Sequence, residues 1–464
     1  MLYRKTFWSD KMKGKTLISD FTQGNIAKQL FTFATPLFLS SLLQVVYNMV
    51  DMAVVGHVLG KTGLSAVSVG GDVSGFLTFI AMGFSNAGQV IIAQYIGAGK
   101  KERLGRFIAT MFSFLTIVAA TLSVICFVFR RGILTLMNTP EEAFSEALGY
   151  STVCIVGMVF IYGYNMVSAV LRRMGDSKHP FVFISIAAVL NIILDIIFVK
   201  YWSMGSAGAA LATVISQAVS FASCCVFLYK RKSDFGFDFR LKYFVNWDGK
   251  MLSELVKLGV PMAIKSASIH FSKLFVNSWI NSYGVEVSAF AGVANKVNSI
   301  ANLLSNSLNT AGSSMVGQNI GAKQFGRVPK IMATLFASGL CISAVMSVVI
   351  YLFPEQVFGL FTSDKAVLSV AMEYLPVATV MFFGSAFRAP MNALINGSGI
   401  HKINFATAIF DGIVMRIGLS VLFGIAFNMG YIGFWLGDAL AGYTPFFIGI
   451  AFYFSGKWKN KVIK

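Results

Sequence analysis

Long apolar segments follow one another along the whole chain, and short polar stretches separate them. A helix that crosses the hydrocarbon core of a membrane needs about 20 mostly apolar residues, and each segment supplies that length. Lipid offers no hydrogen-bond partner to a bare backbone, so each crossing segment must be helical. The sequence therefore predicts an all-α integral membrane protein with twelve transmembrane helices, at residues 26–55, 64–97, 104–129, 146–171, 179–200, 206–229, 251–281, 286–319, 326–352, 367–395, 401–427 and 431–455.

The composition supports this class and excludes several others. Hydrophobic residues make up 56% of the 464 residues and charged residues 12%, whereas a soluble protein carries about 25% charged residues. This excludes a soluble enzyme, a disordered chain and a small disulfide-stabilised domain. The five cysteines all lie in apolar segments without the spacing of a metal site. We therefore expect no cofactor, apart from H⁺ or Na⁺ as a coupling ion.

The basic residues indicate how the chain is oriented. Of the 38 Lys and Arg residues, 28 fall at the termini and in the loops of one side, and five fall on the other side. Positively charged loops remain in the cytoplasm, so both termini are predicted to be cytoplasmic. Because topology accounts for the net charge of +18, no nucleic-acid partner is expected. We predict a multi-pass protein of a plasma membrane, bacterial in type, with the lipid bilayer as its surroundings and a monomer as its state.

The two halves of the chain repeat one another. Pro36 aligns with Pro261, and AQYIGAGKKERLGR from Ala93 aligns with GQNIGAKQFGRVPK from Gly317. Each half has six crossings, an even number, so the halves share one orientation and form parallel repeats, as in many transporters. We expect two six-helix bundles around a central cavity. The predicted divisions are a cytoplasmic N-terminal segment at 1–25, an N-lobe at 26–229, a cytoplasmic linker at 230–250, a C-lobe at 251–455 and a cytoplasmic tail at 456–464.

Two carboxylates lie deep in the predicted N-lobe, where a charge is costly enough to indicate function. At 1.5 Å per residue, Asp51 and Asp195 lie at similar depths in the outer half of the membrane. Oxygen ligands suit a small hard cation, and two close carboxylates also suit a proton. We predict a coupling site for H⁺ or Na⁺ at Asp51, Asn191, Asp195, Thr213 and Tyr150. The alternative is that the acids only hydrogen-bond neighbouring helices.

Further polar residues recur at helical spacing and are predicted to face the cavity. Gln44, Tyr47 or Asn48, and Asp51 form a stripe on the first helix. The eighth helix carries an asparagine stripe that includes Asn302. The predicted cavity residues drawn from these patterns are Gln44, Tyr47, Asn48 and Asn302, together with Met166, whose flexible thioether suits a promiscuous apolar surface.

The C-lobe has a different polar content, because Val276, Met415 and Leu419 replace Asp51, Asn191 and Asp195. Lys265 and Lys273 are eight residues apart and share a helix face, so they could attract an anionic group. His270 falls on another face and is either a packed polar residue or part of the cavity. The remaining charged residues are Arg388, also placed in the cavity, and Asp411, Arg416 and Asp438, which we expect to neutralise one another.

Several of these segments resemble the multidrug and toxic compound extrusion (MATE) family. They are YNMVDMAVVG, NIILDIIF, GSAGAALATVISQ and the paired AQYIGAG and GQNIGA, and the resemblance covers about residues 20–455. It implies two six-helix lobes and the export of organic, often cationic compounds in exchange for Na⁺ or H⁺. It implies ion-site roles for Asp51, Asn191, Asp195 and Thr213, polar roles in helix 4 for Tyr150 and Asn165, and bending at Pro36. The seventh and tenth helices have no acidic residue at mid-depth, so the chain resembles the branch with its ion site in the N-terminal lobe.

We therefore predict a secondary active multidrug efflux antiporter, not an enzyme, that exports small amphipathic organic compounds by alternating access. One alternative is a flippase or exporter of an anionic or lipid-linked saccharide, which Lys265, Lys273, Arg388 and Arg416 would favour. A membrane-embedded enzyme would need clustered acids or a His-Glu-x-x-His helix, and the sequence has neither. A channel fits less well with two divergent lobes and an ion site in one of them.

Overall fold

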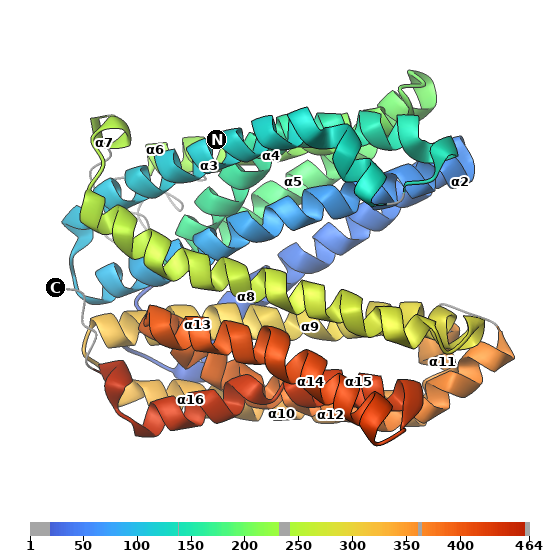
Figure 1. Cartoon of the computed structure of the whole chain (residues 1–464). Coiled ribbons are helices and arrows are strands. Elements are labelled where there is room, and N and C mark those ends of the chain that lie inside the picture. The colour runs from blue at the N-terminus through green and yellow to red at the C-terminus, as the bar shows by residue number, and fades with distance from the viewer. Residues whose placement is uncertain (1–18, 138, 232–241, 361–363, 460–464) are drawn as a thin grey trace, which may run out of the picture.

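The computed structural model describes residues 19–137, 139–231, 242–360 and 364–459, and every regular element in these ranges is a helix (Figure 1). The predicted N-terminal segment, linker and C-terminal tail lie partly outside the described residues. The elements of the first half are α2 (Ile26–Gly97), α3 (Lys101–Leu136), α4 (Glu141–Arg173), α5 (Lys178–Asp195), the π-helical η1 (Ile196–Tyr201) and α6 (Gly205–Lys230).

The second half begins after a short linker helix and repeats the same order. Its elements are α7 (Lys242–Val245) in the linker, α8 (Gly249–Asn281), α9 (Val285–Gly321), α10 (Arg327–Leu352), α11 (Pro354–Gly359), α12 (Lys365–Ser398), α13 (His401–Ile409), η2 (Phe410–Val414), α14 (Met415–Val421), η3 (Leu422–Ala426), α15 (Gly430–Ala441), α16 (Thr444–Phe454) and η4 (Lys457–Lys459).

The first two predicted crossings form one continuous element, α2, which reverses direction at Gly60. Gly60 has φ of 64°, a left-handed conformation that glycine adopts without steric cost. The reversal follows from the contacts at the two ends of α2. Phe21, just before the helix, hydrogen-bonds Gln318, and Gly97 at its end packs against the backbone of the same Gln318. In the second half, the last predicted crossing is interrupted between α15 and α16, and the eleventh contains the π turns η2 and η3.

Together the described helices form two six-helix bundles, the N-lobe and the C-lobe, which lie side by side (Figure 1). The lobes exchange the first halves of two helices. Leu30, Phe33 and Leu37 of α2 pack in a hydrophobic cluster with C-lobe residues of α9, α10 and α12. Conversely, Leu255 and Met262 of α8 pack among N-lobe residues of α2, α3 and α4. The first crossing of each repeat therefore begins against one lobe and ends in the other.

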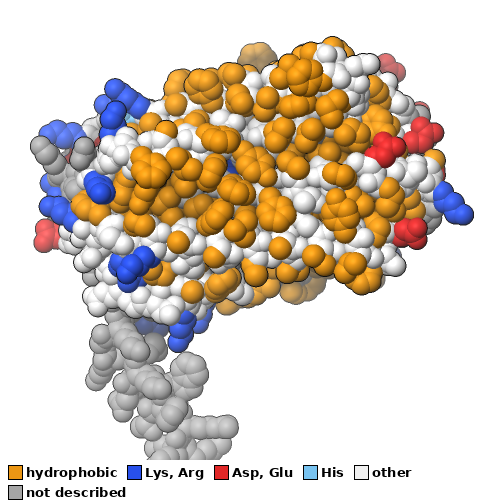
Figure 2. All heavy atoms as spheres, turned by 90° about the horizontal axis from the view of Figure 1, so that it is seen from below, with side chains coloured by type: hydrophobic (Ala, Val, Ile, Leu, Met, Phe, Trp, Pro, Cys, Tyr) orange, Lys and Arg blue, Asp and Glu red, His pale blue; other side chains and the backbone are white. Residues whose placement is uncertain are grey.

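One end of the molecule is basic and the opposite end is acidic. The basic end includes Lys178 and Lys250 at the starts of α5 and α8, and the acidic end includes Glu141 and Glu286 at the starts of α4 and α9. Figure 2 shows apolar side chains across the middle of one face, with Lys and Arg mainly at the left end and Asp and Glu mainly at the right. This banding is that of a protein embedded in a bilayer.

Eight of the described helices are long and apolar enough to cross a membrane. The other four crossings are the second part of α2, α8, α9 and the α15–α16 pair. The polar content of α8 and α9 explains why they fall below that standard, since these helices carry the lysines and the asparagine stripe. A helix with this composition faces protein or water rather than lipid. The two polar helices therefore identify the interior of the molecule.

Candidate functional site

The first crossing places two of its polar residues inside the N-lobe. Tyr47 and Asp51 are buried, Gln44 is half-buried and Asn48 is exposed. Tyr47 and Asp51 are four residues apart, so their side chains lie one above the other on the same helix face. The hydroxyl of Tyr47 accepts a hydrogen bond of 3.5 Å from the Nε2 of Gln217 on α6. Two residues of the polar stripe predicted on this helix, Tyr47 and Asp51, are therefore part of the site.

The fifth crossing provides the second carboxylate. Asp195 is fully buried and is the last residue of α5, where the helix widens into the π turn η1. Such π turns interrupt α-helices frequently at functional sites. One turn earlier, Asn191 is buried and its Nδ2 lies 3.4 Å from the Oγ1 of Thr213 on α6. Three helices therefore contribute polar atoms to one region.

The structure brings the two carboxylates of the N-lobe close enough to interact electrostatically. Asp195 interacts with Asp51, and Tyr47 interacts with both. Tyr150 on α4 is buried, contacts Cys154 one turn along the same helix, and interacts with Asp51. All five residues predicted for the coupling site therefore belong to one cluster, although no ion identity follows from their arrangement.

The cluster contains an unusual number of buried oxygens without a hydrogen-bond partner in the described part of the chain. These atoms are Oδ1 of Asp51, Oδ1 of Asn191, both carboxylate oxygens of Asp195 and Oε1 of Gln217. Leaving a buried polar atom unpaired costs about 1–3 kcal/mol, and more for a charge. A bound proton or a small cation would satisfy these oxygens, so the donor set fits either coupling ion.

Two members of the cluster were missed by the sequence analysis. Gln217 lies four residues after Thr213 on α6, so the i, i+4 spacing from a predicted ligand was a usable signal. Cys154 lies four residues after Tyr150 in the same way and contacts Ser74 of α2. Gln217 and Cys154 both lie in apolar stretches of sequence, so they did not stand out as site residues.

The residues predicted for the substrate cavity fall into different environments. Asn48, His270 and Lys273 are exposed, and Gln44 and Asn302 are half-buried. Polar side chains exposed along membrane-spanning helices border water rather than lipid. These residues of α2, α8 and α9 are therefore accessible in full or in part, and their role in a cavity stays a prediction.

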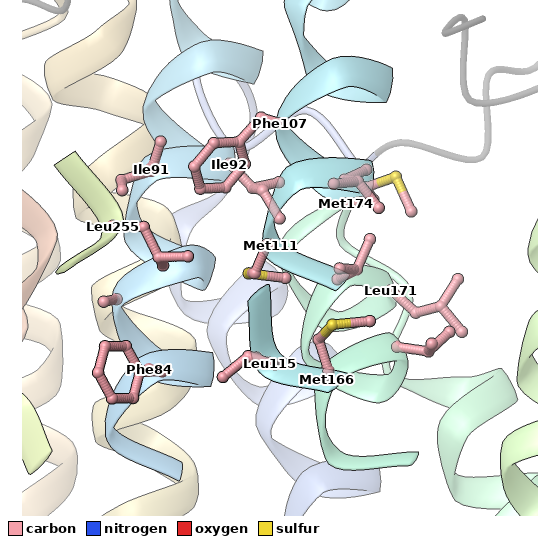
Figure 3. Close-up of a cluster of buried hydrophobic side chains, with 14 of the residues drawn as sticks. Phe84, Ile91, Ile92, Phe107, Met111, Leu115, Met166, Leu171, Met174 and Leu255 are labelled. Atoms are coloured by element: carbon pink, nitrogen blue, oxygen red, sulfur yellow. The ribbon is translucent and has the colours of Figure 1, made fainter. Parts of the chain in front are cut away.

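Two predicted cavity residues of α4 lie differently. The Nδ2 of Asn165 donates a hydrogen bond of 2.8 Å to the carbonyl oxygen of Ile161 in its own helix. Met166 is buried in a hydrophobic cluster, where Figure 3 shows it beside Leu115 and Met111 of α3. It also borders a small apolar pocket between α3, α4 and α6. Its placement is that of a packing residue.

The charged residues of the C-lobe form a compact arrangement. Arg416, which is buried, donates a hydrogen bond of 3.3 Å to Asp411 and a second, short one to Asp438. This confirms that the three residues neutralise one another. Lys265 donates a hydrogen bond of 2.9 Å to Oδ1 of Asn392, and Arg388 is half-buried one turn before Asn392 on α12.

The lobes are joined at the basic end by polar contacts. The Nε2 of Gln94 donates a hydrogen bond of 2.8 Å to the carbonyl oxygen of Gly397. The segment that precedes α2 also spans the lobes, because the backbone N–H of Ser19 bonds Met174 of the N-lobe and that of Phe21 bonds Gln318 of the C-lobe. Access between the lobes is therefore closed at this end.

Comparisons with known proteins place this site in a family context. A family model described as MatE matches residues 36–197 and 261–422, once in each repeat. "Probable multidrug resistance protein YoeA" of Bacillus subtilis (strain 168) is 30% identical over 447 residues, which cover 95% of this chain and 96% of that protein. "Probable multidrug resistance protein NorM" of Thermotoga maritima is 24% identical over 446 residues, covering 94% of each chain.

A solved structure has the same fold. It is described as the outward-facing conformation of a multidrug resistance MATE family transporter of the MOP superfamily, and it aligns with a TM-score of 0.88. The alignment covers 97% of this chain and 99% of that one, at 22% sequence identity. At this identity the likeness establishes the fold alone.

Proposed function

We propose that this chain, which belongs to the MATE family of membrane transporters, is a multidrug efflux antiporter coupled to H⁺ or Na⁺. Its substrates would be amphipathic, mostly cationic organic compounds. The observation that carries the proposal is the group of unpartnered oxygens around Asp51 and Asp195 inside a two-lobed fold. The names of the relatives, which refer to multidrug resistance, support the substrate class.

The coupling ion would bind within the N-lobe cluster. Asp51 and Asp195 would supply charge, while Asn191, Thr213 and Gln217 would supply neutral oxygens. A proton would bind because ionising both of two neighbouring carboxylates in a low-dielectric site is costly. Na⁺ would bind because several oxygen ligands replace its hydration shell. In either case the ion removes the cost of leaving these oxygens unpaired.

The basic end would face the cytoplasm of the cell, because lysine and arginine are retained on that side of a membrane. Both termini would then be cytoplasmic. The contacts of Gln94, Phe21 and Gln318 join the lobes at this end, so the arrangement would correspond to a state closed towards the cytoplasm. Export would require these contacts to break and the lobes to separate at the basic end.

Ion binding and lobe movement would be linked through the first crossing. Asp51 lies in the part of α2 inside the N-lobe, whereas Leu30 and Leu37 anchor the start of α2 on the C-lobe. Pro36 lies in the anchored part, where it removes one backbone hydrogen bond and weakens the helix. Neutralising Asp51 would remove its need for water and allow this helix to bend at that point.

Coupling requires each ligand to change the affinity of the other by the same factor. An ion bound between Asp51 and Asp195 would lower the affinity of the cavity for a cationic drug, and the drug would favour ion release. A tenfold proton gradient supplies about 1.4 kcal/mol, since one pKa unit corresponds to that energy. The gradient would therefore be sufficient to bias an equilibrium between two open states.

A second candidate function is the export of an anionic or lipid-linked saccharide. The observation that favours it is the set of C-lobe bases, Lys265, Lys273 and Arg388, beside the cavity. A pyrophosphate or an acidic sugar would find positive charge there. We place it second because the N-lobe cluster would have no evident role in binding such a substrate.

The test is transport of rhodamine 6G by purified protein in liposomes under an imposed pH or Na⁺ gradient. We expect gradient-driven transport by the wild-type protein and its loss in Asp51→Asn. The matched control is Glu142→Gln, an exposed acid in the first turn of α4 at the acidic end, which should transport normally. Folded wild-type protein that moves no organic cation under either gradient would refute the proposal.

A further inference from the structure

The C-lobe contains more positive charge than its acids neutralise. Both carboxylates of the region, Asp411 and Asp438, are bonded to Arg416. Three further bases lie within electrostatic range of this trio, and we refer to Lys265, Lys273 and Arg388 as the C-lobe basic cluster. Arg388 interacts with Asp411, Arg416 and Asp438. Lys265 interacts with Asp411 and Lys273 with Asp438, and both lysines also interact with Arg388.

The basic cluster is formed by two helices. Lys265 and Lys273 share a face of α8, being eight residues apart. The hydrogen bond from Lys265 to Asn392 links α8 to α12, one turn from Arg388. Within the described residues, Lys273 and Arg388 have no hydrogen bond and no carboxylate at salt-bridge distance, and Lys273 is exposed. The cluster is therefore both held in place and accessible.

The depth of Lys265 excludes an ordinary surface role for this residue. Lys265 is sixteen residues from either end of α8, which places it about 24 Å from each end. Its side chain cannot extend from that depth to the aqueous phase at a helix end, as a snorkelling lysine does. Together with Arg416 the cluster gives four bases beside two carboxylates. Excess positive charge within a membrane is costly, and such residues mark a binding site by default.

We propose that the C-lobe basic cluster is a subsite for an anionic group, a carboxylate, sulfonate or phosphate, on the transported compound. Arg388 supplies the planar guanidinium that binds such a group through two parallel hydrogen bonds, and Lys273 supplies a mobile point charge. Because the N-lobe carries acids and the C-lobe carries bases, the substrates include zwitterionic amphiphiles. The inference deepens the proposed export function and rests on it.

A pair of dyes isolates the anionic group. Rhodamine 6G is an ethyl ester with one positive charge, and rhodamine 19 is its free acid, a zwitterion with the same ring system. Binding of each dye is measured by fluorescence polarisation to protein in nanodiscs of phosphatidylcholine. Lys273→Gln and Arg388→Gln should weaken rhodamine 19 binding about tenfold or more and should not weaken rhodamine 6G binding, because removing a base lessens repulsion of a cation. Arg388→Lys should restore part of the affinity.

Two controls keep the result interpretable. Lys200→Gln changes an exposed base in the turn that follows α5 and should alter neither dye. Rhodamine 6G affinity at or above the wild-type level shows that each variant is folded. Lys273→Gln alone, at an exposed position, suffices if Arg388→Gln does not fold. Equal weakening of both dyes, or no weakening of either, would overturn the inference.

A second experiment distinguishes an anionic group on the transported compound from the headgroup of an anionic lipid. If a lipid headgroup occupies the same subsite, phosphatidylglycerol added to the nanodiscs would compete with rhodamine 19 in the wild type but not in Arg388→Gln. If no such competition occurs, the subsite belongs to the transported compound. The proposed function has a separate readout. If rhodamine 6G is not transported under a gradient, the antiporter fails, whereas equal dependence of both dyes on Arg388 removes only the anionic subsite.

Discussion

Gly97 and Gly321 occupy equivalent positions in the two repeats, and each packs against the glutamine backbone of the opposite repeat. A Cβ added at Gly97 would overlap the carbonyl oxygen of Gln318, and one added at Gly321 would overlap that of Gln94. The two copies of the repeated motif therefore contact each other across the lobes. This contact closes the basic end.

Replacing either glycine by alanine should force the lobes apart at the basic end. We expect Gly97→Ala and Gly321→Ala to increase, several-fold, the maleimide labelling of a cysteine introduced at buried Val90, which lies beside Gly399 of the C-lobe. The measurement uses a background without the native cysteines. Gly326→Ala at the same end is the control, since a Cβ there meets no atom within 4 Å. Unchanged labelling in both variants would show that the contact does not hold this end closed.

The stability of the protein should depend on the coupling ion through Asp195. An ion that binds only the folded state stabilises it by about 2.7 kcal/mol at one hundred times its dissociation constant. We expect the thermal unfolding midpoint of the wild type to rise with the coupling ion, H⁺ or Na⁺, and that of Asp195→Asn to be insensitive to it. Glu373→Gln, which removes a carboxylate bonded to Tyr431 in the C-lobe, should keep the wild-type response. An Asp195→Asn variant with that response would exclude Asp195 from the site.

Gln217 should contribute to ion affinity without being essential for transport. Its Nε2 bonds Tyr47 while its Oε1 has no partner among the described residues. We expect Gln217→Leu to raise the ion concentration for half-maximal transport several-fold, because one neutral ligand is lost, while the maximal rate changes little. Ser220→Ala on the next turn of α6 is the control. A lower maximal rate at unchanged ion dependence would indicate a structural role only.

Arg416 should act in stability rather than in transport. Arg416→Met removes the hydrogen-bonded partner of Asp411 and Asp438 in the membrane interior, and breaking a buried pair in this way costs about 3–5 kcal/mol. We expect poor expression and a lower unfolding midpoint. The triple variant Arg416→Met, Asp411→Leu, Asp438→Leu should recover part of the stability, because no carboxylate is left without its arginine partner. Failure of the triple variant to recover would mean that the trio has a further role.

The repeat and the depth of the acids could be predicted from the sequence because both leave local signals. Apolar length and the number of residues from a helix end were enough to place Asp51 and Asp195 in one layer. The roles assigned to the predicted site residues remain predictions. Gln217 was within reach of the same reasoning, since it follows Thr213 by one turn.

Contacts between the lobes could not be predicted in this way. The start of α2 packs on the C-lobe and the start of α8 on the N-lobe, yet an apolar helix surface looks the same whichever lobe covers it. Met166 illustrates the same limit, since a methionine in an apolar run is equally compatible with a cavity wall and with a core. The reversal at Gly60 was also hidden, because one glycine among many gives no distinct pattern.

The most direct test of the account is whether drug binding expels the ion from the N-lobe cluster. Rhodamine 6G is added to purified protein in nanodiscs while proton release and displacement of bound Na⁺ are recorded. We expect release of one of these ions by the wild type, and dye binding without release by Asp51→Asn and Asp195→Asn. Release that persists unchanged in both variants, or dye binding that is independent of both ions in the wild type, would contradict coupling through these two carboxylates.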